Sequence, residues 1–169
     1  GLEEALLQHR LMGAFSPSAG AWKALLAPTD DGQVVASRPY PFFLASPLPV
    51  GPPGEAPLAG AATAWLVEWK WDGVRGQVVK RAGQVWVWTR GEELVTERYP
   101  ELVALAATWP DGTVLDGEIL AWDAAVDQPA PFARLQQRIG RRSVTRKLLT
   151  DVPATFVAYD LLEGDGVDR

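Results

Sequence analysis

Short runs of apolar residues separated by turn residues dominate the chain from Thr63 onward. They are rich in Val, Trp, Leu, Tyr or Phe, as half-buried strands are. Ala82 and Gly83 supply a tight turn between the second and third runs, which predicts a hairpin there. The runs are TAWLVEW, VRGQVVKR, QVWVWTR, TVLDGEILAW and ATFVAYDLL.

Two stretches between these runs have helical spacing instead. The apolar residues of ERYPELVALAATW recur on one helix face, and Pro100 suits the first turn. FARLQQRI forms a second helical stretch after the fourth run. Strands joined mainly by hairpins, with helices inserted, predict an α+β domain built on antiparallel sheets.

The N-terminal part of the chain follows a different pattern. Apolar residues recur at helical spacing from Leu2 to Met12, and Ala21 to Leu26 can form a second short helix. The following segment, ASPLPVGPPGEAPLAGAA, is rich in Pro, Gly and Ala, which disfavours both helices and strand ladders. We therefore expect a short helical segment over residues 1–44, a linker over 45–62 and a second domain over 63–169.

Composition excludes several kinds of chemistry. The chain has no cysteine and a single histidine, His9, which excludes disulfides and thiolate metal sites and argues against a histidine metal cluster or a Ser-His-Asp triad. No apolar run is long enough to span a membrane and no secretory signal pattern is present, so we expect a cytoplasmic protein. The formal net charge of -5 argues against a surface that binds nucleic acid all over.

A local basic cluster stands out against this negative charge. Residues 134–147 contain no acidic residue. Such a run is typical of a solvated helix face, and it is also the pattern of a DNA contact, so both interpretations stay open. The cluster consists of Arg134, Arg138, Arg141, Arg142, Arg146 and Lys147.

The segment EWKWDGVRG, residues 68–76, places a lysine within one of the predicted strands. If residues 64–72 are extended, the two-residue period puts Glu68, Lys70 and Asp72 on one face. Gly73 then permits a sharp turn, or a close approach by another backbone or a ligand. The opposite face, which we expect to be buried, consists of Val67, Trp69 and Trp71.

In this setting Lys70 is a candidate nucleophile. A free lysine is almost wholly protonated at pH 7, so attack requires surroundings that favour the neutral amine. Arg75 favours the neutral amine, whereas Glu68 and Asp72 oppose it, and the sequence leaves the balance open. The alternative is an edge-strand lysine in an exposed ion pair, which contributes about 0–1 kcal/mol.

EWKWDGVR resembles the E-x-K-x-D-G-x-R signature of the covalent nucleotidyltransferases, the superfamily of ATP-dependent DNA ligases, RNA ligases and capping guanylyltransferases. Further motifs of that superfamily are matched in the same order by WTRGEE (88–93), LDGEIL (115–120) and FVAYDLL (156–162). The phrases RPYPFFLASPL and LVTERYPEL resemble bacterial ATP-dependent DNA ligases, in which a helical DNA-binding domain precedes the adenylation domain.

This resemblance implies a fold, a reaction and partners. The fold is an α+β nucleotidyltransferase (ATP-grasp-like) adenylation domain on antiparallel sheets, with residues 1–44 as the end of the helical DNA-binding domain. The implied cofactors are ATP and Mg²⁺ (or Mn²⁺), and the implied partner is nicked double-stranded DNA, bound by a monomer without membrane contact. The implied reaction seals nicks through a lysyl-AMP intermediate, with AMP transferred to a DNA 5′-phosphate.

The resemblance also implies roles for single residues. Lys70 resembles the nucleophile that attacks the α-phosphate of ATP. Glu68 resembles the residue beside adenine, and Arg75 the residue near the ribose and the DNA end. Arg90 resembles an arginine that faces phosphate, and Tyr159 the aromatic residue that stacks on adenine. For Tyr159 the alternative is ordinary core packing.

Strand alternation places Asp116 and Glu118 on one face, so both can line one pocket. Glu118 resembles the ribose-contacting or metal-linked carboxylate of the family, and both residues are candidate Mg²⁺ ligands. For Asp116, a structural hydrogen bond to a loop is an equal alternative.

Two later motifs of the family, E-G and K-x-K, have no counterpart here. Glu163-Gly164 follows the aromatic strand directly, where the family has a turn, and is not interpreted as the metal-binding motif. We therefore expect the chain to cover part of an adenylation domain. Because it lacks contacts that stabilise phosphate charge, the sequence leaves open whether the chain is active alone. The alternatives are an RNA ligase or capping-type enzyme, and a non-catalytic DNA-end-binding module that uses the basic cluster.

Overall fold

The computed structural model describes residues 36–43, 61–141 and 143–169, together with Ser18, Gly20, Trp22 and Lys23. Residues 41–70 form one unit and are described by themselves. The other unit, called here the sheet unit, is described over residues 36–40, 71–141 and 143–169, together with the four residues named above. The helix predicted over 2–12 lies outside the described residues, as do most of the helix predicted over 21–26 and most of the linker predicted over 45–62.

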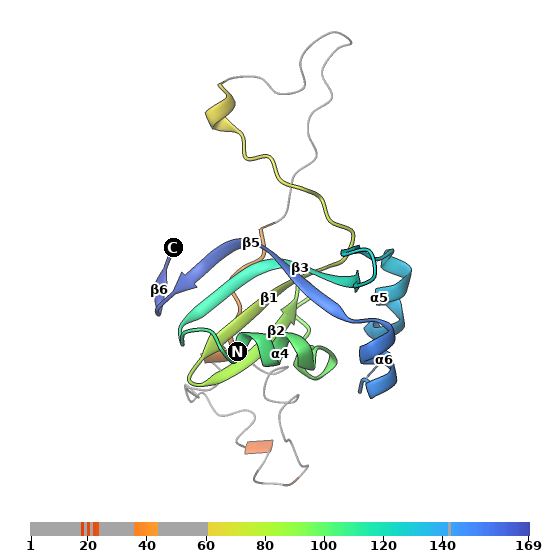
Figure 1. Ribbon diagram of the computed structural model, residues 1–169. Helices are drawn as coiled ribbons and strands as arrows, with labels where there is room; N and C mark the ends of the chain where they lie inside the picture. The colour runs from red at the N-terminus through yellow and green to blue at the C-terminus, as the bar shows by residue number, and fades with distance from the viewer. Residues whose placement is uncertain (1–17, 19, 21, 24–35, 44–60, 142) are drawn as a thin grey trace. The chain divides into compact units, whose positions relative to one another are not determined.

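The described residues of the sheet unit form a six-stranded antiparallel sheet that curls along its length (Figure 1). Its main path is β2-β1-β3-β5-β6, and β4 pairs with β3 beside this path. The runs predicted as strands from Val74 onward are confirmed, and so is their antiparallel pairing. The strands are β1 (Val74–Arg81), β2 (Gln84–Thr89), β3 (Thr113–Asp123), β4 (Gln128–Pro129), β5 (Ala154–Gly164) and β6 (Val167–Asp168).

The turn between β1 and β2 is the predicted hairpin. Ala82 and Gly83 have φ angles of 47° and 72°. Two-residue hairpin turns favour positive φ at both positions, because this twist matches that of the strands. Asp165 and Gly166 repeat the arrangement between β5 and β6, with φ angles of 55° and 75°. Glu163-Gly164 therefore ends a strand and precedes the turn, rather than following the strand as the sequence analysis expects.

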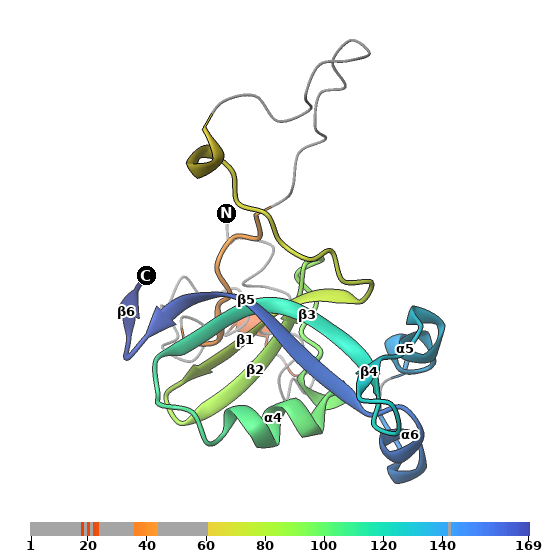
Figure 2. The ribbon, with the colours of Figure 1, turned by 45° about the horizontal axis from the view of Figure 1, so that its top comes forward.

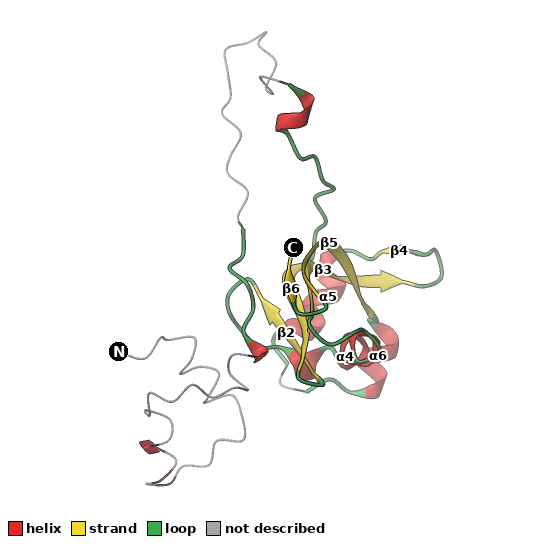
Figure 3. Cartoon of the chain, turned by 90° about the vertical axis from the view of Figure 1, so that its left-hand side faces the viewer, coloured by secondary structure: helices red, strands yellow, loops and turns green. Residues whose placement is uncertain are grey.

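Helices cover one face of the sheet (Figure 2). The predicted helices are present as α4 (Pro100–Ala106) and α5 (Phe132–Ile139). A further helix, α6 (Arg146–Asp151), begins after Thr145, whose hydroxyl accepts the N–H of Leu148 at 3.3 Å. Figure 3 shows α4 and α6 on the same side of the strands. None of the helices in the described ranges has the length and apolar character that crossing a membrane requires.

The apolar core lies between this sheet face and the helices. Val78 and Val87 pair across β1 and β2, and Ile119 of β3 joins them. Leu102 of α4 and Leu135 of α5 pack against them from the helical layer. Complete burial of each such side chain contributes about 1.5–3 kcal/mol. Because side chains alternate along a strand, the neighbours of Val78 in β1 face the other side of the sheet.

The strand predicted over residues 63–72 does not form. Ala62–Ala64 make a 3-10 turn, and the first strand begins at Val74. Val67 and Trp69 are each 81% exposed, so the prediction that they form a buried face is wrong. A high content of Trp and Val indicates that a segment can pack in a half-buried sheet. The segment forms a strand only if a partner strand is available. Within the described ranges, no strand pairs with this segment.

Candidate functional site

Polar side chains gather on the sheet face opposite the helices. In the β1-β3 ladder, Arg75 lies opposite Glu118 and Gln77 lies opposite Asp116. Residues that face each other across an antiparallel pair have side chains on the same side of the sheet. Asp116 and Glu118 therefore share one face, as strand alternation predicts.

Asp116 is buried and holds two hydrogen-bond donors. Arg75 Nε lies 2.5 Å from Asp116 Oδ1 and forms an ion pair with it. Gln77 Nε2 donates to Asp116 Oδ2 at 3.2 Å. A buried carboxylate requires such partners, because an unpaired buried charge costs several kcal/mol. This arrangement favours the structural role for Asp116 over metal binding.

Tyr159 of β5 connects Arg75 with Glu118. Its hydroxyl donates to Glu118 Oε2 at 3.2 Å, and the guanidinium carbon of Arg75 lies 4.4 Å from the ring centroid. Such a cation over an aromatic face is attractive. Burial, followed by the charge and the hydrogen bond of Glu118, raises the pKa of Tyr159 to about 12, although Arg75 opposes the rise. The hydroxyl therefore remains a donor at alkaline pH.

Gly73 allows the chain before β1 to pass close to Glu118. A Cβ on Gly73 would collide with the carbonyl oxygen of Ile119 and lie 2.9 Å from Cγ of Glu118. No larger residue fits there without moving β3. Of the alternatives that the sequence leaves open at Gly73, the structure shows the close approach of another backbone.

Arg90 follows β2, as the second motif predicts. Its backbone N–H donates to the carbonyl oxygen of Arg75 at 3.0 Å, which places its main chain beside the main chain of Arg75. Its side chain is exposed. An exposed guanidinium is suited to an anionic ligand such as phosphate.

Glu68 and Lys70 belong to the unit of residues 41–70 and are both exposed. The structure therefore brings together four of the predicted site residues, and the placement of Glu68 and Lys70 beside them stays a prediction. The cluster that the structure assembles, called here the Arg75 cluster, consists of Arg75, Asp116, Glu118 and Tyr159.

The Arg75 cluster does not form a metal site from protein groups. In the described part of the chain, no three His, Cys, Asp or Glu residues are grouped to hold an ion. Asp116 is already engaged by Arg75 and Gln77. Mg²⁺ requires octahedral oxygen coordination. The residues described here therefore do not fit a protein-built Mg²⁺ site, and the assignment of Asp116 and Glu118 as its ligands gains no support.

The basic residues of 134–147 do not form one surface. Arg138 is fully buried, pairs with Glu101, and has its guanidinium carbon 4.9 Å from the ring centroid of Tyr99. Lys147 is exposed and pairs with Asp151 at 2.6 Å. Arg142 lies outside the described residues. Because Arg138 is buried in the core, it is not available on the surface to contact DNA. The interpretation of residues 134–147 as a DNA contact is weaker without it.

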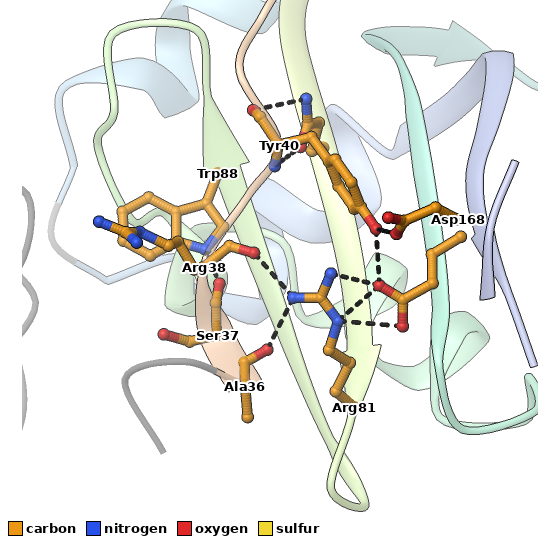
Figure 4. Close-up of polar contacts among 9 residues, drawn as sticks. Ala36, Ser37, Arg38, Tyr40, Arg81, Trp88 and Asp168 are labelled. Atoms are coloured by element: carbon orange, nitrogen blue, oxygen red, sulfur yellow. Dashed lines mark hydrogen bonds and ion pairs between the residues drawn. The ribbon is translucent and has the colours of Figure 1, made fainter. Parts of the chain in front are cut away.

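A second polar cluster on the same sheet face was not predicted from the sequence (Figure 4). Arg81 forms an ion pair with Glu163, and its Nη1 donates to the carbonyl oxygens of Ala36 at 3.2 Å and Arg38 at 2.8 Å. Strand alternation from Arg75 does place Arg81 on the polar face. Its partners lie far away in the sequence, so the pattern of β1 contains no signal for them.

Tyr40 completes this second cluster. Its hydroxyl lies within hydrogen-bond distance of Asp168 and of Glu163, the latter at 3.0 Å. Burial, followed by the hydrogen bonds and charges of these two carboxylates, raises the pKa of Tyr40. Nearby, Trp88 Nε1 donates to the carbonyl oxygen of the buried Ser37 at 2.6 Å. Residues 36–40 are thus fastened across the polar face, and this set of contacts is called here the Tyr40 clasp.

Comparison with known proteins identifies the family. Residues 55–168 match the family described as the ATP dependent DNA ligase domain. The chain belongs to this family. All residues of the Arg75 cluster, and both Glu68 and Lys70, lie within the matched part.

Several relatives of the ligase family match over most of this chain. A probable DNA ligase of Koribacter versatilis is 34% identical over 135 residues, which are 78% of this chain and 22% of the relative. DNA ligase C of Mycobacterium tuberculosis is 40% identical over 121 residues, 68% of this chain and 33% of the relative. A solved structure of mycobacterial DNA ligase D complexed with ATP and MES covers 60% of this chain and 30% of its own, with 36% identity and a TM-score of 0.47. The chain thus spans a third or less of the length of these relatives.

Proposed function

We propose that this ligase-family chain supplies the nucleotide-binding part of an ATP-dependent DNA ligase that seals nicks through AMP bound covalently to Lys70. The observation that carries the proposal is the register of β1, β3 and β5. It brings Arg75, Glu118 and Tyr159, which come from three separate ligase-like motifs, into one cluster. Residues 1–44 are proposed as the end of a DNA-binding domain, residues 45–62 as a linker and residues 63–169 as part of the adenylation domain.

The proposed reaction has three transfers. The neutral amine of Lys70 attacks the α-phosphate of ATP, a phosphorus–nitrogen bond forms, and pyrophosphate leaves. The 5′-phosphate at a nick then attacks the same phosphorus, which releases Lys70 and gives adenylated DNA. Finally the 3′-hydroxyl attacks the 5′-phosphate, the phosphodiester forms and AMP leaves. The covalent step divides one difficult ligation into easier transfers.

The Arg75 cluster offers complementary groups for a nucleotide. The cations of Arg75 and Arg90 suit phosphate oxygens. The carboxylate of Glu118 can accept hydrogen bonds from ribose hydroxyls, and the ring of Tyr159 can stack on adenine. Glu68 is proposed to lie beside the base. Mg²⁺, or Mn²⁺ in its place, is proposed as the ion of the reaction without assigned protein ligands.

Covalent labelling tests this proposal. The natural protein that contains this sequence should take up label from ATP labelled at the α-phosphate, and the label should stay on the denatured protein until acid hydrolyses the phosphorus–nitrogen bond. Lys70→Ala should abolish the label. Lys147→Ala, which also removes an exposed lysine, should leave it unchanged. Label that persists in Lys70→Ala would overturn the assignment of the nucleophile.

The substrate and the rival functions require separate measurements. Sealing of nicked DNA, compared with a nicked duplex containing RNA, distinguishes the DNA ligase from an RNA ligase. A DNA-end-binding module without catalysis would bind DNA with strong salt dependence and never take up label. Salt-dependent binding without labelling would therefore contradict the proposed enzyme.

A further inference from the structure

We infer that Gln77 is a positioning residue that sets the orientation of Arg75 through Asp116, and that the backbone of Tyr40 in turn orients Gln77. The inference rests on the proposed function, because it concerns the affinity of the Arg75 cluster for ATP. It assigns a role to a side chain that lies outside the motif residues themselves.

The orientation of the Gln77 amide is determined by the backbone of Tyr40. Tyr40 N–H donates to Gln77 Oε1 at 2.8 Å, and Gln77 Nε2 donates to the carbonyl oxygen of Tyr40 at 3.1 Å. The second N–H of Nε2 is directed to Asp116 Oδ2 at 3.2 Å. A flipped amide would place its oxygen against both acceptors, so only one orientation satisfies all three partners. Gln77 is fully buried, which makes an unsatisfied group there costly.

Asp116 connects the fixed orientation of the Gln77 amide with the orientation of the Arg75 guanidinium. With Oδ2 held by Gln77, the carboxylate presents Oδ1 to Arg75 Nε at 2.5 Å. The guanidinium is thereby held by one edge above the ring of Tyr159. Among the residues that the structure describes, the two Nη groups of Arg75 have no hydrogen-bond partner, and the side chain is 29% exposed. These groups can donate to oxygen atoms of a nucleotide.

The side-chain contacts of the Tyr40 clasp are separate from the backbone contacts that orient Gln77. The Tyr40 hydroxyl contacts Glu163 and Asp168, and Arg81 donates to carbonyl oxygens on either side of Ser37. Figure 4 shows Tyr40 with its hydroxyl directed to Asp168 and its main chain engaged separately. The hydroxyl therefore holds the segment, whereas the backbone orients Gln77.

Gln77→Glu tests the relay because it keeps the shape and changes the donor. When the introduced carboxyl group is ionised, it would face the Tyr40 carbonyl and Asp116 with acceptors only, which should displace Arg75. Burial and the neighbouring carboxylate favour the protonated form of the new side chain, and its one O–H restores part of the relay at low pH. We expect the KM for ATP in self-adenylation to rise roughly tenfold or more toward about pH 9, and to return toward the wild-type value near about pH 6.

Tyr40→Phe is the matched control. It removes the hydroxyl contacts to Glu163 and Asp168 but keeps the backbone groups that orient Gln77. The variant should unfold at a lower temperature, while its KM for ATP should follow the wild-type pH profile. A purely structural role of Gln77 would instead lower stability in both variants without a pH-dependent KM.

The outcomes separate this inference from the proposed function. A wild-type protein that takes up no label contradicts the proposed function. A wild-type protein that is labelled, together with a Gln77→Glu variant whose KM equals the wild-type value at every pH, overturns the relay. If Gln77→Glu does not fold, Gln77→Met provides the test. Its KM should rise at every pH without a titration, and an unchanged KM in the folded variant would equally overturn the inference.

Discussion

The guanidinium of Arg75 covers one face of the Tyr159 ring, 4.4 Å from the ring centroid, while the hydroxyl of the same tyrosine donates to Glu118. A base that stacks on Tyr159 must therefore use the other face of the ring or displace Arg75. Either way, the ring and the hydroxyl serve different partners. Their contributions can be separated by substitution.

Tyr159→Leu should weaken ATP binding much more than Tyr159→Phe. Phenylalanine keeps the aromatic face, whereas leucine removes the proposed stacking, which is worth about 1–3 kcal/mol, or roughly a 5- to 150-fold rise in the KM for ATP. Steady-state self-adenylation at varied ATP concentration measures both effects. Equal losses in the two variants would show that the hydroxyl contact to Glu118, rather than the ring, is what matters.

The tyrosines should resist ionisation while the chain is folded. The chain has three tyrosines, and burial is the first cause of the raised pKa in Tyr40, Tyr99 and Tyr159. Stability that depends on protonated Tyr159 is complete below about pH 10 and is lost as the pH rises to about 12. Tyrosinate absorbance should therefore stay below half of its maximum at about pH 10. Full ionisation with a midpoint near about pH 10 in the folded protein would contradict this result.

Arg138→Ala should strongly destabilise the sheet unit. The substitution leaves Glu101 and the carbonyl oxygen of Val152 without their buried partner. Breaking a fully buried ion pair from one side costs about 3–5 kcal/mol, and we expect the lower end of that range because Glu101 is 29% exposed and keeps the N–H of Ala154. Arg141→Ala provides the control, since Arg141 is exposed and contacts the carbonyl oxygen of Gln137, and it should change stability by no more than about 0.5 kcal/mol. Urea unfolding compares the two, and equal midpoints would show that Arg138 contributes nothing to stability.

Gly117→Ala should lower the stability of the sheet unit, whereas Gly140→Ala should leave its stability nearly unchanged. A Cβ on Gly117 would collide with the carbonyl oxygen of Val157 and lie 2.7 Å from Cζ of Phe156. Overpacking of this kind costs about 1–3 kcal/mol or more. A Cβ on Gly140 meets no atom within 4 Å, and its φ of -89° suits alanine. Thermal unfolding of both variants checks the contrast, and an unchanged midpoint for Gly117→Ala would contradict the register of β3 and β5.

The sequence predicts the parts of this fold that depend on local pattern. Alternation identifies β1 and β3 and places Asp116 and Glu118 on one face, and Ala82-Gly83 marks the hairpin. The same reasoning fails at residues 63–72, because strand-forming residues do not reveal whether a partner strand exists. The short helix α6 offers too few turns for a periodic signal.

The other features that the sequence did not predict depend on partners that are distant in the sequence. Arg138 is one charge among several in the sequence, and nothing local reveals that it is buried or that it pairs with Glu101, 37 positions earlier. Gln77 likewise gives no local sign of its role, because the backbone of Tyr40 that orients it is also 37 positions away. Motif resemblance locates the Arg75 cluster, but the residues that hold it in place are visible only in three dimensions.

The Tyr40 clasp would hold the two parts of the sheet unit together if the chain were cut between them. Tyr40 and Trp71 belong to the same unit, so the polypeptide leaves that unit after one and returns to it at the other. A single break anywhere in residues 41–70 would therefore divide the protein into two polypeptides. In the described ranges, noncovalent contacts of residues 36–40 with Gln77, Arg81 and Trp88 would remain between them. The fold thus has the connectivity of a two-piece complementation system, in which the polypeptide that carries residues 36–40 is supplied in trans.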